Sequence, residues 1–327
     1  MISNSKTLQL EVTNRCTIAC PACPRTIYQD MLVINDVAID AVVRACNGFD
    51  RVFMCGNEGD PIYHPQFKEL LAAIRTAHPH ISFNWHTNGS FRTKQWWEEL
   101  MTVLDERDHI VFSIDGMPHN NHMYRVNSKW SFIKDAIDAV VSSDKKVRTT
   151  WKWILFDYNQ SDIFDGIALA KELGINLFNL NVSNRTAPGA VHLTSELDDL
   201  LKRLLEIYPG MDYFNPEKPS DPNFTDPVDP QCVKMPMDPY IDAHGRYFPC
   251  CFGGNIGKLD QWMEWLGDDR DVWNINNHDL QYIMNHSSVH RLKDSWKTGS
   301  FELCASLCAP SFKKTPTFHN EWRIWFH

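Results

Sequence analysis

Short apolar runs alternate with longer segments of helical periodicity over the first half of the chain. Residues 51–55 and 109–114 are apolar runs of strand length, whereas residues 66–77 repeat apolar positions at the spacing of one helix face. Further predicted strands lie at 8–12, 81–85, 147–156 and 176–180, and further predicted helices at 94–104, 130–141 and 162–173, the last ended by Gly174. This alternation indicates about six right-handed βαβ units and a mainly parallel sheet.

The pattern changes after residue 181. A helix is predicted at 194–207, and the Pro- and Asp-rich run at 215–222 is too polar for a core element, which indicates a linker. Residues 240–250 then alternate as a hairpin with a turn at His244-Gly245, and a second helix is predicted at 289–296. The aromatic-rich tail at 318–326 holds a single Arg, so we expect it to pack against the protein or a partner rather than bind a membrane.

Composition narrows the class of protein. The 327 residues are 43% hydrophobic and 22% charged, which are ordinary globular values and exclude a disordered chain. The net charge of −9 disfavours a broad nucleic-acid-binding surface. No signal peptide and no membrane-length apolar run is present. Ten cysteines in tight clusters, without a secretion signal, favour metal binding in a reducing cytoplasm over disulfides.

The first cysteine cluster follows the first predicted strand directly. Cys16, Cys20 and Cys23 have the spacing C-x3-C-x2-C, and Pro21 and Pro24 prevent a regular helix through the loop. Three thiolates this close in sequence can hold an iron–sulfur cluster. Three ligands leave one iron open, as at a catalytic metal site. A zinc knuckle is the alternative that this spacing leaves open.

This loop resembles that of the radical S-adenosylmethionine (SAM) superfamily, which implies an α/β fold built on a partial (β/α)6 barrel. The resemblance implies that Cys16, Cys20 and Cys23 hold a [4Fe–4S] cluster whose open iron binds SAM. It also implies a flavodoxin- or ferredoxin-type electron donor. Reductive cleavage then gives methionine and a 5′-deoxyadenosyl radical, which abstracts hydrogen from a substrate carbon. The chain would accordingly be an oxidoreductase or modifying enzyme.

The loop at residues 55–65 resembles the Gly-Gly-Glu-Pro motif of the family, which receives the amino group of SAM. Asp60 follows Gly59 at the acidic position, one methylene shorter than the usual Glu, and Glu58 is the neighbouring alternative. A carboxylate beside a cationic ammonium is the chemistry that this site requires. An ordinary Gly-Asp-Pro turn would explain the same residues without any ligand.

Further candidates follow the next strands, where sites of parallel sheets lie. Thr87 and Asn88 are similar to the Thr-Asn-Gly segment of the family, although Asn-Gly also serves turns. The resemblance implies SAM contacts for Ser113 foremost, then for Asp115 and Arg125. On the following strand, Lys152 lies between Trp151 and Trp153, which point to the opposite side. Lys152 is a catalytic or substrate-binding candidate if it faces the barrel interior; the alternative is a solvated lysine beside packed tryptophans.

A second cysteine set follows the linker. The Gly-x4-Cys end of the hairpin resembles the auxiliary-cluster domains called SPASM and twitch, but the longer cysteine run of full SPASM domains is missing. The resemblance therefore implies one further [4Fe–4S] cluster, held by Cys232, Cys250, Cys304 and Cys308. Cys251 could replace Cys250, and a four-cysteine zinc site is the alternative. We expect a barrel at 1–185, a helical segment and linker at 186–228, an auxiliary-cluster domain at 229–312 and a tail at 313–327.

The substrate is a small molecule or a peptide, and no motif identifies it. The chain begins at the first strand, which favours a small molecule or a leaderless protein target over a leader-bound peptide. Two rival functions stay open: a non-catalytic metal-stabilised binding protein, and a nucleic-acid-modifying radical enzyme, which the acidic charge disfavours. No membrane partner is expected.

Overall fold

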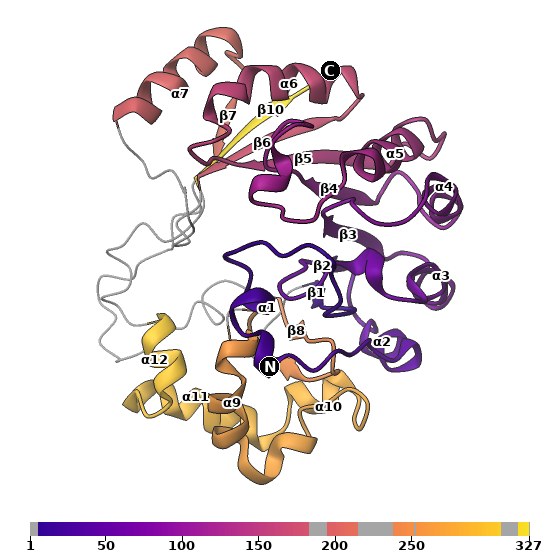
Figure 1. Ribbon diagram of the computed structural model, residues 1–327. Coiled ribbons are helices and arrows are strands. Elements are labelled where there is room, and N and C mark those ends of the chain that lie inside the picture. The colour runs from indigo at the N-terminus through magenta and orange to yellow at the C-terminus, as the bar shows by residue number, and fades with distance from the viewer. Residues whose placement is uncertain (1–5, 183–194, 215–237, 252, 309–319, 327) are drawn as a thin grey trace. The chain divides into compact units, whose positions relative to one another are not determined.

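The structure is a computed structural model (Figure 1) that describes residues 6–182, 195–214, 238–251, 253–308 and 320–326. The chain forms two compact units, each assembled from separate segments. The first comprises Met1–Arg15, Tyr28–Phe83 and Glu217–Pro316, and the second comprises Cys16–Ile27, Asn84–Pro216 and Thr317–His327. The domain limits at residues 185, 228 and 312 stay a prediction.

The first unit joins the amino-terminal strands to the hairpin of the second half. Strand β1 (Thr7–Leu10) pairs in parallel with β2 (Arg51–Met54) and with β8 (Tyr240–Ile241), which forms an antiparallel hairpin with β9 (Tyr247–Phe248). The predicted turn at His244-Gly245 is confirmed. Segments some 230 positions apart in the sequence therefore share one set of strands, with Gln9 opposite Tyr240.

The α-helices in the described part of the first unit are α2, α3, α9, α10, α11 and α12, with bounds Ile39–Ala45, Phe67–Ala77, Leu259–Leu266, Leu280–Met284, Ser287–Thr298 and Glu302–Cys308. Helix α3 buries Phe67, Leu70, Leu71 and Ile74, the apolar face that its sequence spacing predicts. In the second half of the chain, the buried ring of Trp262 in α9 contacts the rings of Trp273 and Phe301.

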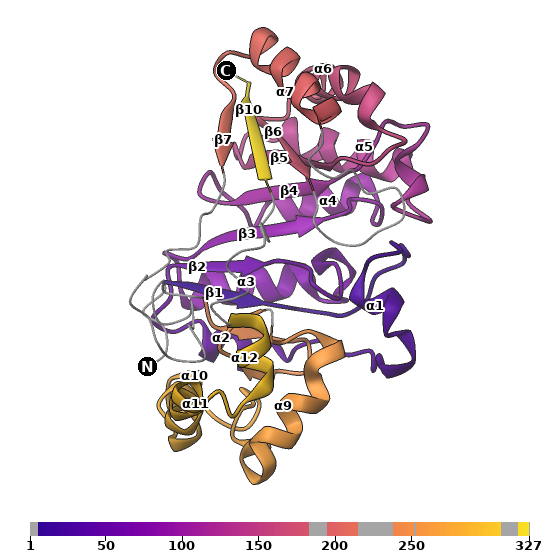
Figure 2. The same ribbon diagram turned by 90° about the vertical axis from the view of Figure 1, so that its left-hand side faces the viewer.

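The second unit carries a parallel set of strands extended by two antiparallel ones. The last four residues of β3 (Ser82–Thr87) pair with β4 (His109–Ser113), followed by β5 (Arg148–Ile154) and β6 (Leu177–Val182), all parallel. Strand β10 (Asn320–Trp325) then lies antiparallel between β6 and β7 (Asp212–Phe214), as Figure 2 shows. The carboxyl-terminal segment is thus an internal strand of this unit.

Helices cover one face of these strands. Helices α4 (Lys94–Met101), α5 (Trp130–Val141) and α6 (Ile163–Glu172) lie along one face, where Trp97 contacts Phe112 and Trp130 contacts Trp151. A Cβ at Gly166 of α6 would lie 2.6 Å from Trp153, so this glycine permits close packing there. Helix α7 (Ser195–Ile207) lies beside α6, with Arg203 over the Phe164 ring. The helices therefore bury the apolar face of the strands.

The elements predicted from periodicity are confirmed in type throughout the first half, with ends that shift by at most three residues. Helix α6 ends one residue before Leu173, and Gly174 follows with a positive φ of 78°. Helices α2, α9, α10 and α12 and strands β7 and β10 were not predicted from the sequence. In the described part of the chain, no helix has the length and apolarity that crossing a membrane demands.

Candidate active site

The cysteine loop lies in the second unit, against the ends of β4 and β5. Cys20 is buried, whereas Cys16 and Cys23 are half-buried, and none of the three is in a disulfide. Ile18, Cys20 and Ala22 pack against Tyr124 and Phe156. The backbone N–H of Ala19 donates to Val126 O at 3.0 Å, and the short helix α1 (Pro24–Ile27) ends the loop. Apolar packing on alternate residues thus holds a loop that proline keeps out of a helix.

Two polar side chains donate hydrogen bonds to the sulfurs. Asn88 Nδ2 lies 3.5 Å from Cys16 Sγ, and Arg125 Nη1 lies 3.8 Å from Cys20 Sγ. Such donors stabilise negative charge on sulfur, as they do in iron–sulfur proteins. The structure therefore brings two of the predicted SAM-site residues to the cysteines themselves.

Asp115 fixes the position of Arg125. Its Oδ2 accepts from Arg125 Nε at 2.6 Å, and its Oδ1 accepts from Ile154 N at 2.7 Å. The backbone carbonyl of Asp115 accepts from Tyr158 Oη at 2.7 Å and from Asn159 Nδ2 at 2.9 Å. The carboxylate at the end of β4 is therefore fully buried and bonded to its surroundings.

Burial and neighbouring charges shift the pKa values of Cys20 and Arg125. Burial raises the pKa of the Cys20 thiol, and the Arg125 guanidinium opposes that rise. Burial also lowers the pKa of Arg125, but the attraction of Asp115 outweighs it, so the pKa lies above its ordinary value. A permanent cation beside Cys20 is therefore built into the loop.

The other predicted residues of this unit divide between the two faces. Thr87 is buried and its Oγ1 accepts from Gly89 N at 3.0 Å, which is turn chemistry. Lys152 is half-buried and pairs in register with Ser113, so the two lie on the face opposite Trp151 and Trp153. Both tryptophans are fully buried on the helix-covered face. Lys152 therefore lies on the face opposite the one that α4, α5 and α6 cover.

The loop predicted to bind the amino group of SAM lies in the first unit. A Cβ on Gly59 would lie 2.0 Å from Thr13 O, so only glycine fits there. The N–H of Asp60 donates to Arg15 O at 3.0 Å, and Asp60 Oδ1 accepts from Ile62 N at 3.3 Å. This loop therefore packs on the residues that directly precede Cys16.

Glu11, which the sequence reasoning did not single out, holds this loop. Its Oε2 accepts from Asn57 N at 2.8 Å, and its Oε1 accepts from Gly59 N at 2.9 Å and Glu58 N at 3.3 Å. Tyr240 Oη donates to Oε2 at 3.3 Å. Burial and the neighbouring Glu58 raise the pKa of Glu11 to about 8. The sequence feature that could have indicated Glu11 is its position as a charged residue among the alternating apolar residues of the strand predicted at 8–12.

Glu58 is the second link in the same unit. Its Oε1 accepts from Ile256 N at 2.6 Å, so its carboxyl fastens the loop to the second half of the chain. Burial, followed by the repulsion of Asp242, raises its pKa to about 7. This oxygen is engaged with the backbone, whereas Asp60 caps the short helix Pro61–Tyr63.

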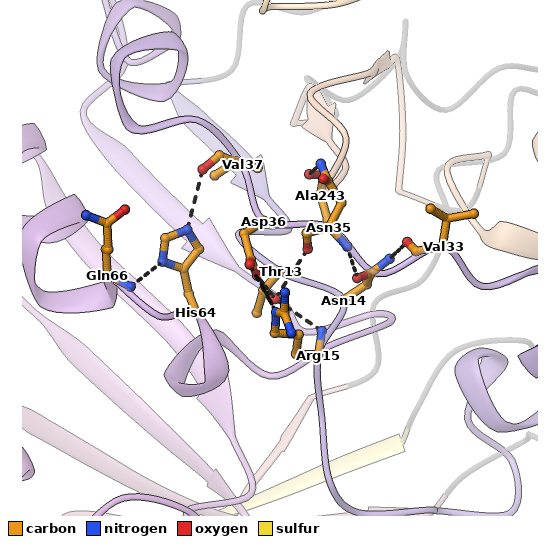
Figure 3. Close-up of polar contacts among 10 residues, drawn as sticks. All are labelled: Thr13, Asn14, Arg15, Val33, Asn35, Asp36, Val37, His64, Gln66 and Ala243. Atoms are coloured by element: carbon orange, nitrogen blue, oxygen red, sulfur yellow. Dashed lines mark hydrogen bonds and ion pairs between the residues drawn. The ribbon is translucent and has the colours of Figure 1, made fainter.

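Residues 13–15 are anchored by a polar network of the first unit (Figure 3). Thr13 Oγ1 donates to Asp36 Oδ1 at 2.6 Å, and Arg15 Nε bonds both oxygens of the same carboxylate. Asn14 Oδ1 accepts from Asn35 N at 2.8 Å, and Asn35 Nδ2 donates to Ala243 O at 2.8 Å. The chain thus enters the cysteine loop from a fixed backbone.

The second cysteine set is only partly described. Cys250, Cys251 and Cys304 are half-buried in the first unit and form no disulfide, and Cys304 lies in α12. Cys232 and the side chain of Cys308 lie outside the described residues. Across the described residues, no group of three or more His, Cys, Asp or Glu is placed to hold a single metal ion.

The sequence profile of the radical SAM superfamily matches residues 10–186, more than half of the chain. The chain belongs to the radical SAM superfamily. This match includes the cysteine loop, the Gly59 loop and strands β2 to β6. No curated protein sequence matches the chain.

Solved structures share the fold. SuiB of Streptococcus suis bound to S-adenosylmethionine is 15% identical, with a TM-score of 0.54 over 77% of this chain and 61% of SuiB. Native anSMEcpe with bound AdoMet is 14% identical, with a TM-score of 0.57 over 91% of this chain and 88% of that one. The chain spans about three fifths of the length of SuiB. At these identities the likeness shows the fold alone, a mixed α/β fold with a largely parallel sheet.

The donor set of the loop fits the cluster that radical SAM membership implies. Iron–sulfur clusters take cysteine thiolates, each on a separate iron, and Cys16, Cys20 and Cys23 are unbridged thiols on one short loop. Hydrogen-bond donors to two of these sulfurs are already in place. Such donors and burial are the means by which a protein tunes a cluster.

Proposed function

We propose that this chain is a radical SAM oxidoreductase or modifying enzyme whose [4Fe–4S] cluster is held by Cys16, Cys20 and Cys23. The observation that carries the proposal is the buried Asp115–Arg125 pair, which presents a cation to Cys20, together with the Asn88 amide at Cys16. When bound, the cluster supplies the electron that splits SAM into methionine and a 5′-deoxyadenosyl radical, which then abstracts hydrogen from a substrate carbon.

The residues of the chain then have distinct parts in the proposal. Arg125 and Asn88 stabilise charge on the sulfurs, and Asp115 orients Arg125. Gly59 keeps the loop close to the backbone before Cys16, and Asp60 is the acidic candidate for the amino group of SAM. Ser113 and Thr87 are the candidates for further contacts with SAM. A flavodoxin- or ferredoxin-type protein would supply the electron, in a reducing compartment such as the cytoplasm.

We further propose that Cys232, Cys250, Cys304 and Cys308 hold a second [4Fe–4S] cluster in a twitch-like region. The unbridged thiols of Cys250 and Cys304 support this donor set. A second cluster would accept the electron that a substrate radical releases, giving net oxidation, or would carry electrons inward.

The substrate is a peptide or a small molecule. Folds of this kind include SuiB bound to the precursor peptide SuiA and anSMEcpe bound to the Kp18Cys peptide, with TM-scores of 0.55 and 0.57. These neighbours support testing peptides first as substrates.

The test is SAM cleavage by the anaerobically reconstituted protein. With dithionite and SAM, we expect 5′-deoxyadenosine to form. We expect Cys20→Ala to lower its rate of formation by about a hundredfold or more, because one cluster ligand is lost. Cys46→Ala is the control, because Cys46 is a buried thiol at the carboxyl end of α2 in the first unit. Absence of 5′-deoxyadenosine from the iron-loaded wild type would overturn the proposal and favour a metal-stabilised binding protein.

A further inference from the structure

One row of polar side chains occupies the face of the second unit that the described helices leave uncovered. Register places Lys152 beside Asn179, Asn179 beside Arg323, and Asn181 beside Glu321. Paired residues of neighbouring strands point to the same side. The residues between them, Phe178, Leu180, Trp322 and Ile324, are apolar and buried on the other side. Polar residues on alternate positions of two adjoining strands are therefore a feature of this face.

These side chains form a directed chain of hydrogen bonds. Arg323 Nη2 donates to Glu321 Oε2 at 3.0 Å, and Asn179 Nδ2 donates to the same oxygen at 3.2 Å. Asn181 Nδ2 in turn donates to Asn179 Oδ1 at 3.1 Å and to Asn179 O at 3.2 Å. Each amide is oriented by the acceptor of the next residue, starting from the carboxylate of the carboxyl-terminal strand.

The chain of hydrogen bonds ends in an acceptor that has no donor. Asn181 is fully buried, and its Oδ1 has no hydrogen-bond partner within the described part of the protein. Turning the amide round would place its oxygen against Asn179 Oδ1 and O, two acceptors, so the observed orientation is the bonded one. Buried polar atoms in native proteins are nearly always paired. Asn181 Oδ1 can therefore still accept a hydrogen bond.

The acceptor lies close to the cysteine loop. Ile154 packs against the apolar cluster that contains Ile18, Cys20 and Ala22 of the cysteine loop. Ile154 is also the register partner of Asn181 on the next strand. Neighbouring strands are about 4.8 Å apart. Asn181 therefore lies one strand, and Glu321 two strands, from a residue in contact with the cysteine loop.

The charges of the face favour a neutral donor. Glu321 is paired with Arg323, and Lys152 lies in the adjacent row. Burial, aided by Lys152 and His109, holds the pKa of His86 well below its ordinary value, so its ring on this face is neutral. An ammonium donor would meet the Lys152 and Arg323 cations, whereas an amide N–H would not.

We propose that Asn181, oriented by Asn179 and by Glu321 of strand β10, positions the substrate by accepting a hydrogen bond from an amide N–H. The substrate class is thus an amide, either a peptide group or the carboxamide of a small molecule. Taking the occupant to be the substrate rests on the proposed function. The carboxyl-terminal strand becomes part of the recognition surface, because its Glu321 sets the orientation of both amides.

Ligand-observed NMR on the reconstituted protein tests this with matched probes. Acetyl-triglycine amide presents N–H donors; the same molecule methylated at every amide nitrogen presents none; acetamide represents a small carboxamide; and sorbitol presents only hydroxyls. We expect the wild type to bind the N–H peptide or acetamide at least fivefold more tightly than the methylated peptide. Preference for the peptide over acetamide identifies a peptide source, and the reverse identifies a small molecule.

The variants Asn181→Val and Glu321→Leu should each reduce that preference to below twofold, whereas the matched control Asn277→Val, at an exposed position of the first unit, should keep it. If Asn181→Val fails to fold, Glu321→Leu alone decides. Equal binding of the methylated probe, tighter binding of sorbitol, or an unchanged preference in folded variants would overturn the proposal. Formation of 5′-deoxyadenosine by the wild type without added substrate, measured on the same sample, tests the proposed function separately: its absence overturns that function, whereas its presence with no preference for the N–H probes overturns only this proposal.

Discussion

At the scale of single residues, Gly59 is where the structure leaves least room. The atoms that a Cβ would meet are backbone, Thr13 O at 2.0 Å and Asn14 Cα at 2.7 Å, and they directly precede the cysteine loop. Side chains can turn away from such a clash, but backbone fixed by the Asn14–Asn35 hydrogen bonds cannot do so without breaking them.

We therefore expect Gly59→Ala to lower the free energy of unfolding by about 1–3 kcal/mol and to raise the KM for SAM. Gly210→Ala is the matched control, because no atom lies within 4 Å of the added Cβ, and its stability should change by about 0.5 kcal/mol or less. Urea denaturation and SAM-cleavage kinetics provide the two measurements. Equal stability of the two variants would contradict the steric argument.

Glu58 gives a second prediction at this scale, in its dependence on pH. Its pKa rises from 4.5 to about 7 on folding, so the folded state holds the proton over a pH range in which the unfolded state has released it. Stability contributed by this group is therefore present below about pH 4.5 and is lost as pH rises toward 7. The shift corresponds to roughly 3 kcal/mol.

Glu58→Gln should flatten the fall of the free energy of unfolding between about pH 5 and about pH 7, because Gln keeps an acceptor for Ile256 N and cannot ionise. Glu11, whose pKa burial raises to about 8, adds a fall of its own up to about pH 8. Glu264→Gln, at an exposed site of α9, should leave the wild-type profile unchanged. Parallel profiles for wild type and Glu58→Gln in urea titrations would rule out this account.

At the scale of elements, β10 is the strand that most changes the expected arrangement. It lies between β6 and β7, so its backbone supplies hydrogen bonds to both neighbours. Its two faces divide as those of β6 do, with Trp322 and Ile324 buried on one side and Glu321 and Arg323 on the other. One short segment therefore contributes both core and candidate recognition surface.

We expect Trp322→Ala to cost about 3–5 kcal/mol in the free energy of unfolding, as for other buried aromatic truncations. Trp325→Ala, on the same strand but 41% exposed, is the control and should cost well under about 1 kcal/mol. Chemical denaturation followed by circular dichroism separates the two. Similar losses for both tryptophans would mean that β10 does not pack as the structure describes.

Strand β10 and its pairing could not be predicted from the sequence. Helix periodicity and apolar runs predicted β2 to β6 and α3 to α6, because each pattern lies within one short stretch of sequence. The alternation Glu-Trp-Arg-Ile at 321–324 was visible, but its partner strands lie some 140 and 110 positions earlier. The cysteine motif predicted a metal site from spacing alone, whereas the Asn179–Asn181–Glu321 contacts depend on strand register, which no local pattern contains.

At the scale of the whole molecule, the cysteines fall in two separate units. Cys16, Cys20 and Cys23 belong to the second unit, whereas Cys250 and Cys304 belong to the first. No described cysteine of one set shares a loop or a helix with the other set. Two sites that depend on different units should lose their metal independently.

Iron analysis after anaerobic reconstitution tests that independence. We expect about eight irons in the wild type, about four after Cys16→Ala/Cys20→Ala/Cys23→Ala, and about four after Cys250→Ala/Cys304→Ala. Only the triple variant should lose SAM cleavage directly, because the three cysteines that it lacks would hold the cluster with one iron open. Cys46→Ala should keep the wild-type count, since Cys46 is a fully buried core thiol. Zinc in place of the second four irons, or loss of all iron in either variant, would show that the two cysteine sets are not separate cluster sites.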